Sequence, residues 1–247
     1  MRYLILSDIH SNWEALTAVL AEAGREGYDR IVCCGDLVGY GADPNRVTDW
    51  VRENVEPVIR GNHDKIAVGI GDLEWFNDAA QESALWTRST LTPGNFEYLL
   101  ALPQGPMVLD DLAIVHGSPA DEDEYIITPT DASMVAASVP HPVTFFGHTH
   151  LQGGFQLIGR AAIAVNRVPL RADRFELELQ PDVTYLLNPG SIGQPRDTDP
   201  RAAWAVFDSE ARRVTYRRCG YDIEGAKAKI IQSGLPEGLA FRLDLGR

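Results

Sequence analysis

The N-terminal stretch Tyr3-Leu4-Ile5-Leu6-Ser7-Asp8-Ile9-His10 joins a short apolar run to an acidic and an imidazole side chain. The apolar run predicts a buried β-strand. Asp8 and His10 then lie where this strand passes into a loop. The position is informative, because the loops that follow strands in α/β proteins collect functional groups.

The same pattern, an apolar run followed directly by polar side chains, occurs twice more in the first 64 residues. Arg30 to Cys34 is a second apolar run, and it ends at Gly35-Asp36. Pro57 to Ile59 is a third, and it leads into Gly61-Asn62-His63-Asp64. Strands that alternate with helices predict a parallel sheet with right-handed crossovers. The polar groups after the three strands should therefore meet at one edge of this sheet.

Two helices are predicted between these strands. The first should begin at a capping box formed by Ser11 and Glu14 and end at Gly24. The second should begin at Asp43-Pro44, an N-cap residue followed by proline at the first helical position.

The rest of the chain predicts more helix first and more strand later. Residues 77–102 are predicted to be helical, and Thr130 should cap a short helix over residues 131–137. Short strands are expected at 112–115, 143–146, 155–158, 162–165, 175–179, 183–187, 203–207 and 214–218. Alternation in Phe175 to Leu179 suggests a more antiparallel second sheet. A helix over 223–233 ends the pattern, and with no linker or repeat we expect one domain over residues 1–247.

The composition restricts the function. The 247 residues carry a net charge of −13, and no basic run is present, which disfavours long nucleic acids and anionic membrane surfaces. Three cysteines without regular spacing do not form a disulfide framework, so Cys33, Cys34 and Cys219 are expected to be reduced. No apolar run reaches the length of a membrane span or a signal peptide, so we expect a cytoplasmic protein.

Five short motifs follow apolar strands and contain hard oxygen or imidazole ligands. They are Asp8-Ile9-His10, Gly35-Asp36, Gly61-Asn62-His63-Asp64, His116-Gly117 and Gly147-His148-Thr149-His150. Each motif alone fits an ordinary turn. Five of the six histidines lie in these motifs, with only His141 outside them, and such a distribution is hard to explain by turns.

This set of motifs resembles the calcineurin-like metallophosphoesterase superfamily, and Asn188-Pro189-Gly190-Ser191 is similar to a motif of its small prokaryotic phosphodiesterase branch. The resemblance implies a four-layer α/β/β/α sandwich of two mixed sheets flanked by helices. It also implies two metal sites and a catalytic histidine, His63. One metal would be held by Asp8, His10 and His150, the other by Asn62, His116 and His148, with Asp36 shared by both.

The residue types fit this implication. Mixed imidazole and oxygen ligands suit Mn²⁺, Fe, Zn²⁺, Ni²⁺ or Co²⁺ better than Mg²⁺ or Ca²⁺. Two cations about 4 Å apart can hold both oxygens of an in-line displacement. We therefore expect hydrolysis of a phosphodiester or phosphomonoester of a small substrate by a metal-bound hydroxide, with His63 donating a proton to the leaving oxygen or stabilising charge in the transition state.

Several alternatives remain open. A dinucleoside polyphosphate hydrolase or a protein phosphatase is the second enzymatic interpretation. In the protein phosphatases an aspartate and an arginine stand where this chain has Gly39 and Tyr40, which disfavours that activity and leaves the residue that orients His63 undefined. A nuclease and a non-catalytic protein-binding scaffold are further options. The residues predicted for substrate contact are Asn12, which also fits a helix N-terminus, and Arg60 and Arg196, which also fit solvated surface positions. Specificity should come from the loops 64–75 and 118–130.

Overall fold

The computed structural model describes residues 1–247 except 160 and 171, and its centre is a pair of mixed β-sheets. The first sheet has the order β2-β1-β10-β11-β8. Its strands are β1 (Arg2–Leu6), β2 (Arg30–Cys33), β8 (Arg174–Glu178), β10 (Ala202–Asp208) and β11 (Arg213–Cys219). Strands β1 and β2 are parallel, and the remaining pairs are antiparallel.

The second sheet has the order β3-β4-β5-β9-β6-β7. Its strands are β3 (Met107–Val108), β4 (Ala113–Ile114), β5 (Val143–Phe145), β6 (Gly153–Ile158), β7 (Ala161–Val165) and β9 (Thr184–Asn188). Strands β4, β5 and β9 are parallel. The ends of β4 and β5 therefore bring the histidine motifs that follow them to one edge of the sheet.

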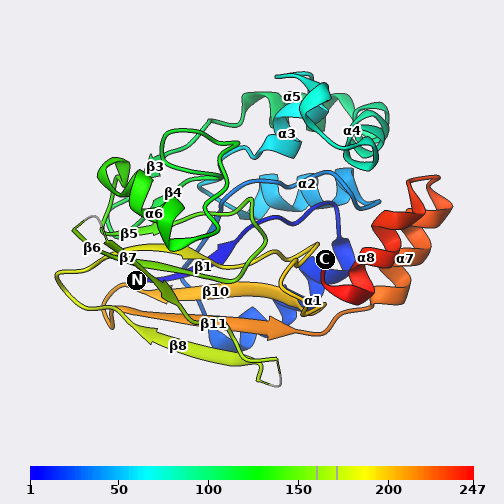
Figure 1. The fold of residues 1–247 in the computed structure, drawn as a ribbon. Helices are drawn as coiled ribbons and strands as arrows, with labels where there is room; N and C mark the ends of the chain where they lie inside the picture. The colour runs from blue at the N-terminus through cyan, green and yellow to red at the C-terminus, as the bar shows by residue number, and fades with distance from the viewer. Residues whose placement is uncertain (160, 171) are drawn as a thin grey trace.

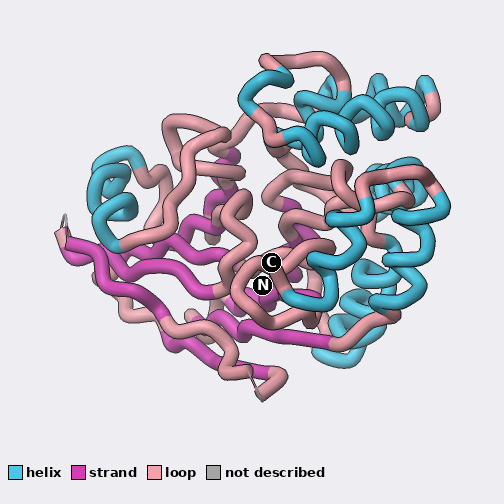
Figure 2. Tube along the Cα trace, turned by 45° about the vertical axis from the view of Figure 1, so that its right-hand side comes forward, coloured by secondary structure: helices cyan, strands magenta, loops and turns pink. Residues whose placement is uncertain are grey.

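Helices flank the two sheets (Figures 1 and 2). The helical elements are α1 (Trp13–Glu26), α2 (Pro44–Asn54), α3 (Asn62–Ala67), η1 (Leu73–Trp75), α4 (Asp78–Thr90), α5 (Pro93–Ala101), α6 (Pro129–Val135), η2 (Ala136–Ser138), α7 (Ile223–Gln232) and α8 (Glu237–Leu245). Figure 1 shows α3, α4 and α5 gathered at one end of the molecule, with α7 and α8 packed together at another side.

Alternation along β1 explains the layering. Leu4 and Leu6 face the core formed with α1 and α2, whereas Tyr3 and Ile5 face the core between the two sheets. Both sets of side chains are at most 2% exposed. The outer face of the second sheet is covered by α6 through a further apolar cluster. The layers therefore run helix, sheet, sheet, helix, which confirms the predicted sandwich.

The strand prediction at 57–59 is wrong, since only Val58 forms a bridge, to Cys33 of β2. Pro57 has no N–H to donate to a ladder, and the amide of Arg60 already bonds to Pro103. The later strands do not all join the second sheet either. Strands β8, β10 and β11 extend the first sheet from β1.

Three predicted helix ends move. The side chain of Asn12, not Ser11, caps α1 by accepting the amide of Ala15, and the helix continues past Gly24 to Glu26 before Gly27 turns with φ of 76°. Thr128, not Thr130, caps α6. A last helix, α8, was not predicted at all.

None of the helices in the described residues combines the length and apolar character that a membrane span requires.

Candidate metal centre

The backbone at the strand ends adopts a conformation that non-glycine residues rarely take. Asp8, His10, Asp36, His148 and His150 have φ of 52°, 48°, 56°, 64° and 60°. Residues held in this region cost about 1–3 kcal/mol each and persist where the surroundings impose them. The turns point the five side chains back toward one another, instead of continuing the strand alternation.

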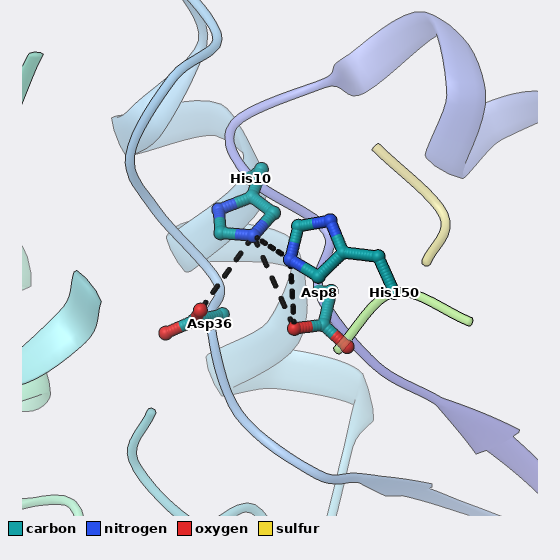
Figure 3. Close-up of side chains that lie close together, drawn as sticks. All are labelled: Asp8, His10, Asp36 and His150. Carbon is teal, nitrogen blue, oxygen red and sulfur yellow. Dashed lines mark hydrogen bonds and ion pairs between the residues drawn. The ribbon is translucent and has the colours of Figure 1, made fainter. Parts of the chain in front are cut away.

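A first cluster contains Asp8, His10, Asp36 and His150 (Figure 3). Each offers one ligand atom, and these atoms lie within 4.8 Å of one another. The Nε2 atom of His10 is 3.0 Å from Nε2 of His150 and 3.5 Å from Oδ2 of Asp36. The Nε2 atom of His150 is 3.3 Å from Oδ1 of Asp8. All four residues are at most 1% exposed.

A second cluster shares Asp36 and adds His116 and His148, again with ligand atoms within 4.8 Å. The Nε2 atom of His116 is 3.4 Å from Oδ2 of Asp36. The side-chain oxygen of Asn62 lies 3.0 Å from Nε2 of His116 and 2.9 Å from Nδ1 of His148. The structure thus brings together all seven residues predicted as metal ligands.

The hydrogen bonds of the imidazoles direct their lone pairs into the clusters. The Nδ1 atoms of His10, His116 and His150 lie 3.0, 2.8 and 2.5 Å from backbone carbonyls, to which they donate. His148 uses Nε2 in the same way, toward the carbonyl of Asp123. The other nitrogen of each neutral ring is then an acceptor.

Acceptors therefore converge on acceptors. Nε2 of His10 faces Nε2 of His150, and Nδ1 of His148 faces the amide oxygen of Asn62. Such an arrangement is repulsive unless a positive charge lies between the atoms. Burial lowers the pKa of His148 to about 3 and lowers the pKa values of His10 and His150, so these rings are neutral at pH 7. His116 differs, because the carboxylate of Asp36 outweighs burial and raises the pKa of its ring to about 10. The donor set fits divalent transition-metal ions.

Asp36 connects the two clusters. Its Oδ1 accepts the amide of His63, but its buried Oδ2 has no hydrogen-bond donor in the described part of the chain. Burial alone disfavours its charge, yet the imidazoles of His116, His63 and His10 hold its pKa well below the usual range. Gly61 allows this approach, because a Cβ there would lie 2.1 Å from Oδ1 of Asp36. An ionised carboxylate with a free oxygen between two clusters is suited to bridge two cations.

The Asn188-Pro189-Gly190-Ser191 segment, which begins at the last residue of β9, supports the ligand loops. The amide of Asn188 donates to Gly147 and to the hydroxyl of Thr149, between the two histidines of that motif. The hydroxyl of Ser191 donates to the carbonyl of Asp8. This segment therefore joins the loop after β5 to the loop after β1.

His63 lies beside the clusters and belongs to neither. Its ring meets the rings of His10 and Phe76 edge to face, with centroids 5.0 Å away in both cases, and the ring of Tyr40 at 4.3 Å. Its Nδ1 has no partner among the described residues, and a Cβ on Gly39 would come within 2.6 Å of it. The opposite ring edge, with Nε2, is turned away from Gly39. Burial lowers the pKa of His63 to about 4, with Arg196 acting in the same direction.

The residue that orients His63 is not Asp64. The carboxylate of Asp64 accepts the amides of Leu37, Val38 and Gly61, so it ties the Gly35-Asp36 loop to the start of α3. The ring of His63 is instead fixed by packing against Gly39, Tyr40 and Phe76.

The three residues predicted for substrate contact lie in different surroundings. Asn12 uses its side chain to cap α1 and to donate to Gly193. Arg60 forms a two-pronged ion pair with Glu122. Arg196 has no carboxylate partner in the described residues; one of its Nη atoms donates to the Tyr40 hydroxyl at 3.2 Å, and its buried Nε is unpartnered.

Tyr40, Arg242 and an aromatic wall complete the surroundings. None was predicted as an individual site residue, although Trp75 and Tyr125 of the wall lie in the loops 64–75 and 118–130 that were expected to determine specificity. The guanidinium carbons of Arg196 and Arg242 lie 5.6 and 5.9 Å from the Tyr40 ring centroid. A cavity of about 550 Å³ adjoins His63, Asn62 and His148 and is lined further out by Trp75, Phe76 and Tyr125. Arg242 belongs to the unpredicted helix α8, and no short motif marks any of these aromatic residues.

Comparison with known families agrees with this geometry. Residues 1–212 match the calcineurin-like phosphoesterase superfamily domain. The chain belongs to this superfamily. The resemblance predicted from the motifs is thereby confirmed.

Similar proteins align with almost the whole length of this chain. An uncharacterized protein of Methanocaldococcus jannaschii is 32% identical over 251 aligned residues, which cover 98% of this chain and 97% of that protein. The crystal structure of a metallophosphoesterase from Sphaerobacter thermophilus is 36% identical, with a TM-score of 0.85 and coverage of 100% and 99%. A hypothetical protein from Pyrococcus horikoshii, 21% identical, shares the fold with a TM-score of 0.76 and coverage of 100% and 98%.

Proposed function

We propose that this protein hydrolyses a small phosphoester at two divalent transition-metal ions. Asp8, His10 and His150 would hold one ion, and Asn62, His116 and His148 the other, with Asp36 shared. The observation that carries the proposal is the convergence of lone pairs around the unpartnered Oδ2 of Asp36. Cations bound there would activate a water molecule and polarise the phosphoryl group.

The chain's own residues supply the remaining steps. Arg196 carries a guanidinium whose charge no carboxylate in the described chain neutralises, and it donates to the hydroxyl of Tyr40, whose ring packs against His63. In this proposal the guanidinium holds a phosphoryl oxygen. His63, neutral at pH 7, presents an N–H to the charge that develops on the leaving oxygen. Ile9 and Leu37, which belong to the loops that carry the metal-binding residues, are fully buried in the core, so these loops are fixed before substrate binds.

The surroundings favour a small ester over a phosphoprotein. Gly39 and Tyr40 occupy the positions of the protein-phosphatase aspartate and arginine, and Gly39 leaves no space for a side chain against His63. A non-catalytic scaffold is disfavoured, because such a protein has no need for a charged arginine and a histidine beside an intact donor set.

Hydrolysis should depend on added metal and on ester type. Protein stripped with a chelator and reloaded separately with Mn²⁺, Fe²⁺, Zn²⁺, Ni²⁺ or Co²⁺ should cleave bis-para-nitrophenyl phosphate or para-nitrophenyl phosphate, and a phosphopeptide much more slowly. Elemental analysis of the loaded protein should approach two ions per chain. Equal release of nitrophenol by stripped and loaded protein, or preference for the phosphopeptide, would contradict the proposal.

Replacing Arg196 with glutamine should raise KM for the phosphoester by about tenfold to a hundredfold, since a charge-assisted hydrogen bond contributes about 1.5–3 kcal/mol. Arg196→Lys keeps the positive charge but loses the planar guanidinium with its paired donors, so its KM should lie between those of the native protein and Arg196→Gln. The matched control is Arg52→Gln, which removes an exposed arginine paired with Asp49 on α2. Steady-state kinetics at fixed metal loading measure the effect. An unchanged KM in Arg196→Gln would show that the guanidinium does not touch the substrate.

A further inference from the structure

The cavity beside the metal centre has walls that the hydrolytic step itself does not require. It measures about 550 Å³ and opens from His63 and His148 toward Trp75 and Tyr125. Its lining comes from separate segments, which include the stretch from α3 through η1 and residues 121–125. Lys65 joins them through ion pairs with Glu122 and Asp123. The cavity is therefore a built feature and large enough for a ring system.

The inner part of the cavity is aromatic and continuous with the site. Phe76 meets the ring of His63 edge to face with centroids 5.0 Å apart. Tyr125 lies against the ring of His148, with centroids 3.9 Å apart and planes 35° from parallel. A group attached to a phosphate beside His63 would thus pass directly between aromatic side chains.

Trp75 is the most informative residue of the cavity wall. Its side chain is 87% exposed, whereas every other tryptophan of the chain is at least partly buried. Tyr125, which also lines the cavity, is 47% exposed. Large aromatic side chains left open around a concave site are suited to stack on a flat ring, and stacking contributes substantially to the binding of nucleobases.

The charges of the wall limit what else the ligand can carry. Asp72, Asp121 and Asp123 line the cavity, with Lys65 as the only lysine or arginine among the described lining residues, and Lys65 is already paired with Asp123. The wall is therefore negative away from the metal centre. It repels a second phosphate and accepts hydrogen bonds from hydroxyl or amino groups.

We propose that this cavity binds an aromatic ring, a nucleobase or an aryl group, carried by the phosphoester and bearing no further phosphate, with Trp75 as the main stacking surface. The inference rests on the proposed phosphoesterase function and names its substrate class. It also separates that class from dinucleoside polyphosphates, whose additional phosphates would meet the acidic wall.

The test compares diesters that share a leaving group without a ring, ethanethiol bound to phosphorus through sulfur, and differ in the retained group: methyl, phenyl, thymidine, and thymidine with a second phosphate on its free hydroxyl. A para-nitrophenyl leaving group would itself bring a ring to the cavity. We expect kcat/KM for the phenyl and thymidine esters to exceed that for the methyl ester at least about tenfold, mainly through KM. The doubly phosphorylated ester should be poorer than the thymidine ester. Comparison of kcat/KM for the phenyl ester with that for the thymidine ester identifies which kind of ring the cavity prefers.

Substitution of Trp75 assigns the effect to the cavity. Trp75→Ala should remove the advantage of the ring-bearing esters while leaving the methyl ester unchanged, and Trp75→Phe should restore most of the advantage. Leu85→Ala, on the exposed face of α4, is the control for loss of a surface apolar group. Equal rates for methyl and ring-bearing esters, or an equal loss for all esters in Trp75→Ala, would overturn the inference.

A binding measurement distinguishes failure of the inference from failure of the proposed function. Phenylphosphonate and thymidine monophosphate are each titrated into the protein, with methylphosphonate as the reference compound without a ring. The two compounds that carry a ring should change the tryptophan fluorescence of the native protein more than methylphosphonate does, and this difference should be absent in Trp75→Phe. If no ester is hydrolysed but this difference is present, the ring site stands and the proposed hydrolysis fails. If esters are hydrolysed and no ring-dependent binding is seen, the ring site is wrong and the hydrolysis stands.

Discussion

Replacing Asp36 with asparagine is expected to lower metal-dependent phosphoester hydrolysis at least about 1,000-fold, equivalent to about 4 kcal/mol of transition-state stabilisation. The reason is the position of Asp36. Its Oδ2 lies 3.5 Å from Nε2 of His10 and 3.4 Å from Nε2 of His116, one atom from each cluster. An amide in its place removes the negative charge that draws two cations together.

The same substitution should leave the fold intact. Oδ1, which accepts the amide of His63, is preserved in asparagine, and the replaced Oδ2 has no donor to lose in the described structure. The new amide N–H can donate to the nearby imidazole lone pairs. Circular dichroism and the unfolding midpoint should therefore stay close to those of the native protein, while bound metal measured by elemental analysis falls from two ions toward one or none.

The control for a lost carboxylate is Asp49→Asn, which removes an exposed acid on α2 that pairs only with Arg52 in the described chain. It should keep both metal ions and full activity. Native-like turnover in Asp36→Asn at equal metal concentration would show that the two clusters do not act as one centre.

The metal ligands were predictable because each belongs to a short motif after a strand. The parallel pairs β1–β2 and β4–β5 place the ends of those strands at common edges, so local sequence and topology together determine which side chains meet. The role of Asn188 and Ser191 in joining Gly147 to Asp8 was not predictable, because the two hydrogen bonds span 41 and 183 residues of sequence.

The surroundings of His63 were not predictable in this way. Gly39 and Tyr40 reach its ring from one segment and Phe76 from another, and no spacing rule links the two. Asp64 is adjacent in sequence but points to backbone amides of another loop. Helix α8 has only Leu239, Ala240 and Leu243 buried, too weak a pattern to mark a helix, so Arg242 escaped notice as well.

The wrong prediction for the start of α1 also results from contacts that local sequence does not reveal. Ser11 has the right spacing to Glu14 for a capping box, but it adopts φ of 53° in the loop that directs His10 into the cluster. The helix therefore begins after Asn12, and Glu14 pairs with Lys229 of α7. The requirements of the site displaced the local preference of the sequence.

Replacing His63 with alanine is expected to lower kcat about 100- to 1,000-fold, with little change in bound metal or in KM. His63 belongs to neither cluster, so metal content should stay near two ions. Burial holds the pKa of this ring at about 4, so the neutral form prevails at pH 7. The ring should therefore act as a hydrogen-bond donor to the leaving oxygen, and its loss should matter more for alkyl than for para-nitrophenyl leaving groups, because alkoxides develop more charge.

Two measurements separate this role from that of a protonated acid. His63→Gln keeps an N–H near the position of Nε2 and should recover part of the activity that alanine loses. The contribution of His63 to kcat, obtained as the ratio of native protein to His63→Ala, should be constant between pH 5 and 8, because a ring with a pKa of about 4 donates the same N–H throughout that range. A contribution that falls with rising pH between 5 and 8 would show that the imidazolium is the active form. Together with equal metal content in both proteins, that profile decides whether His63 transfers a proton or stabilises charge.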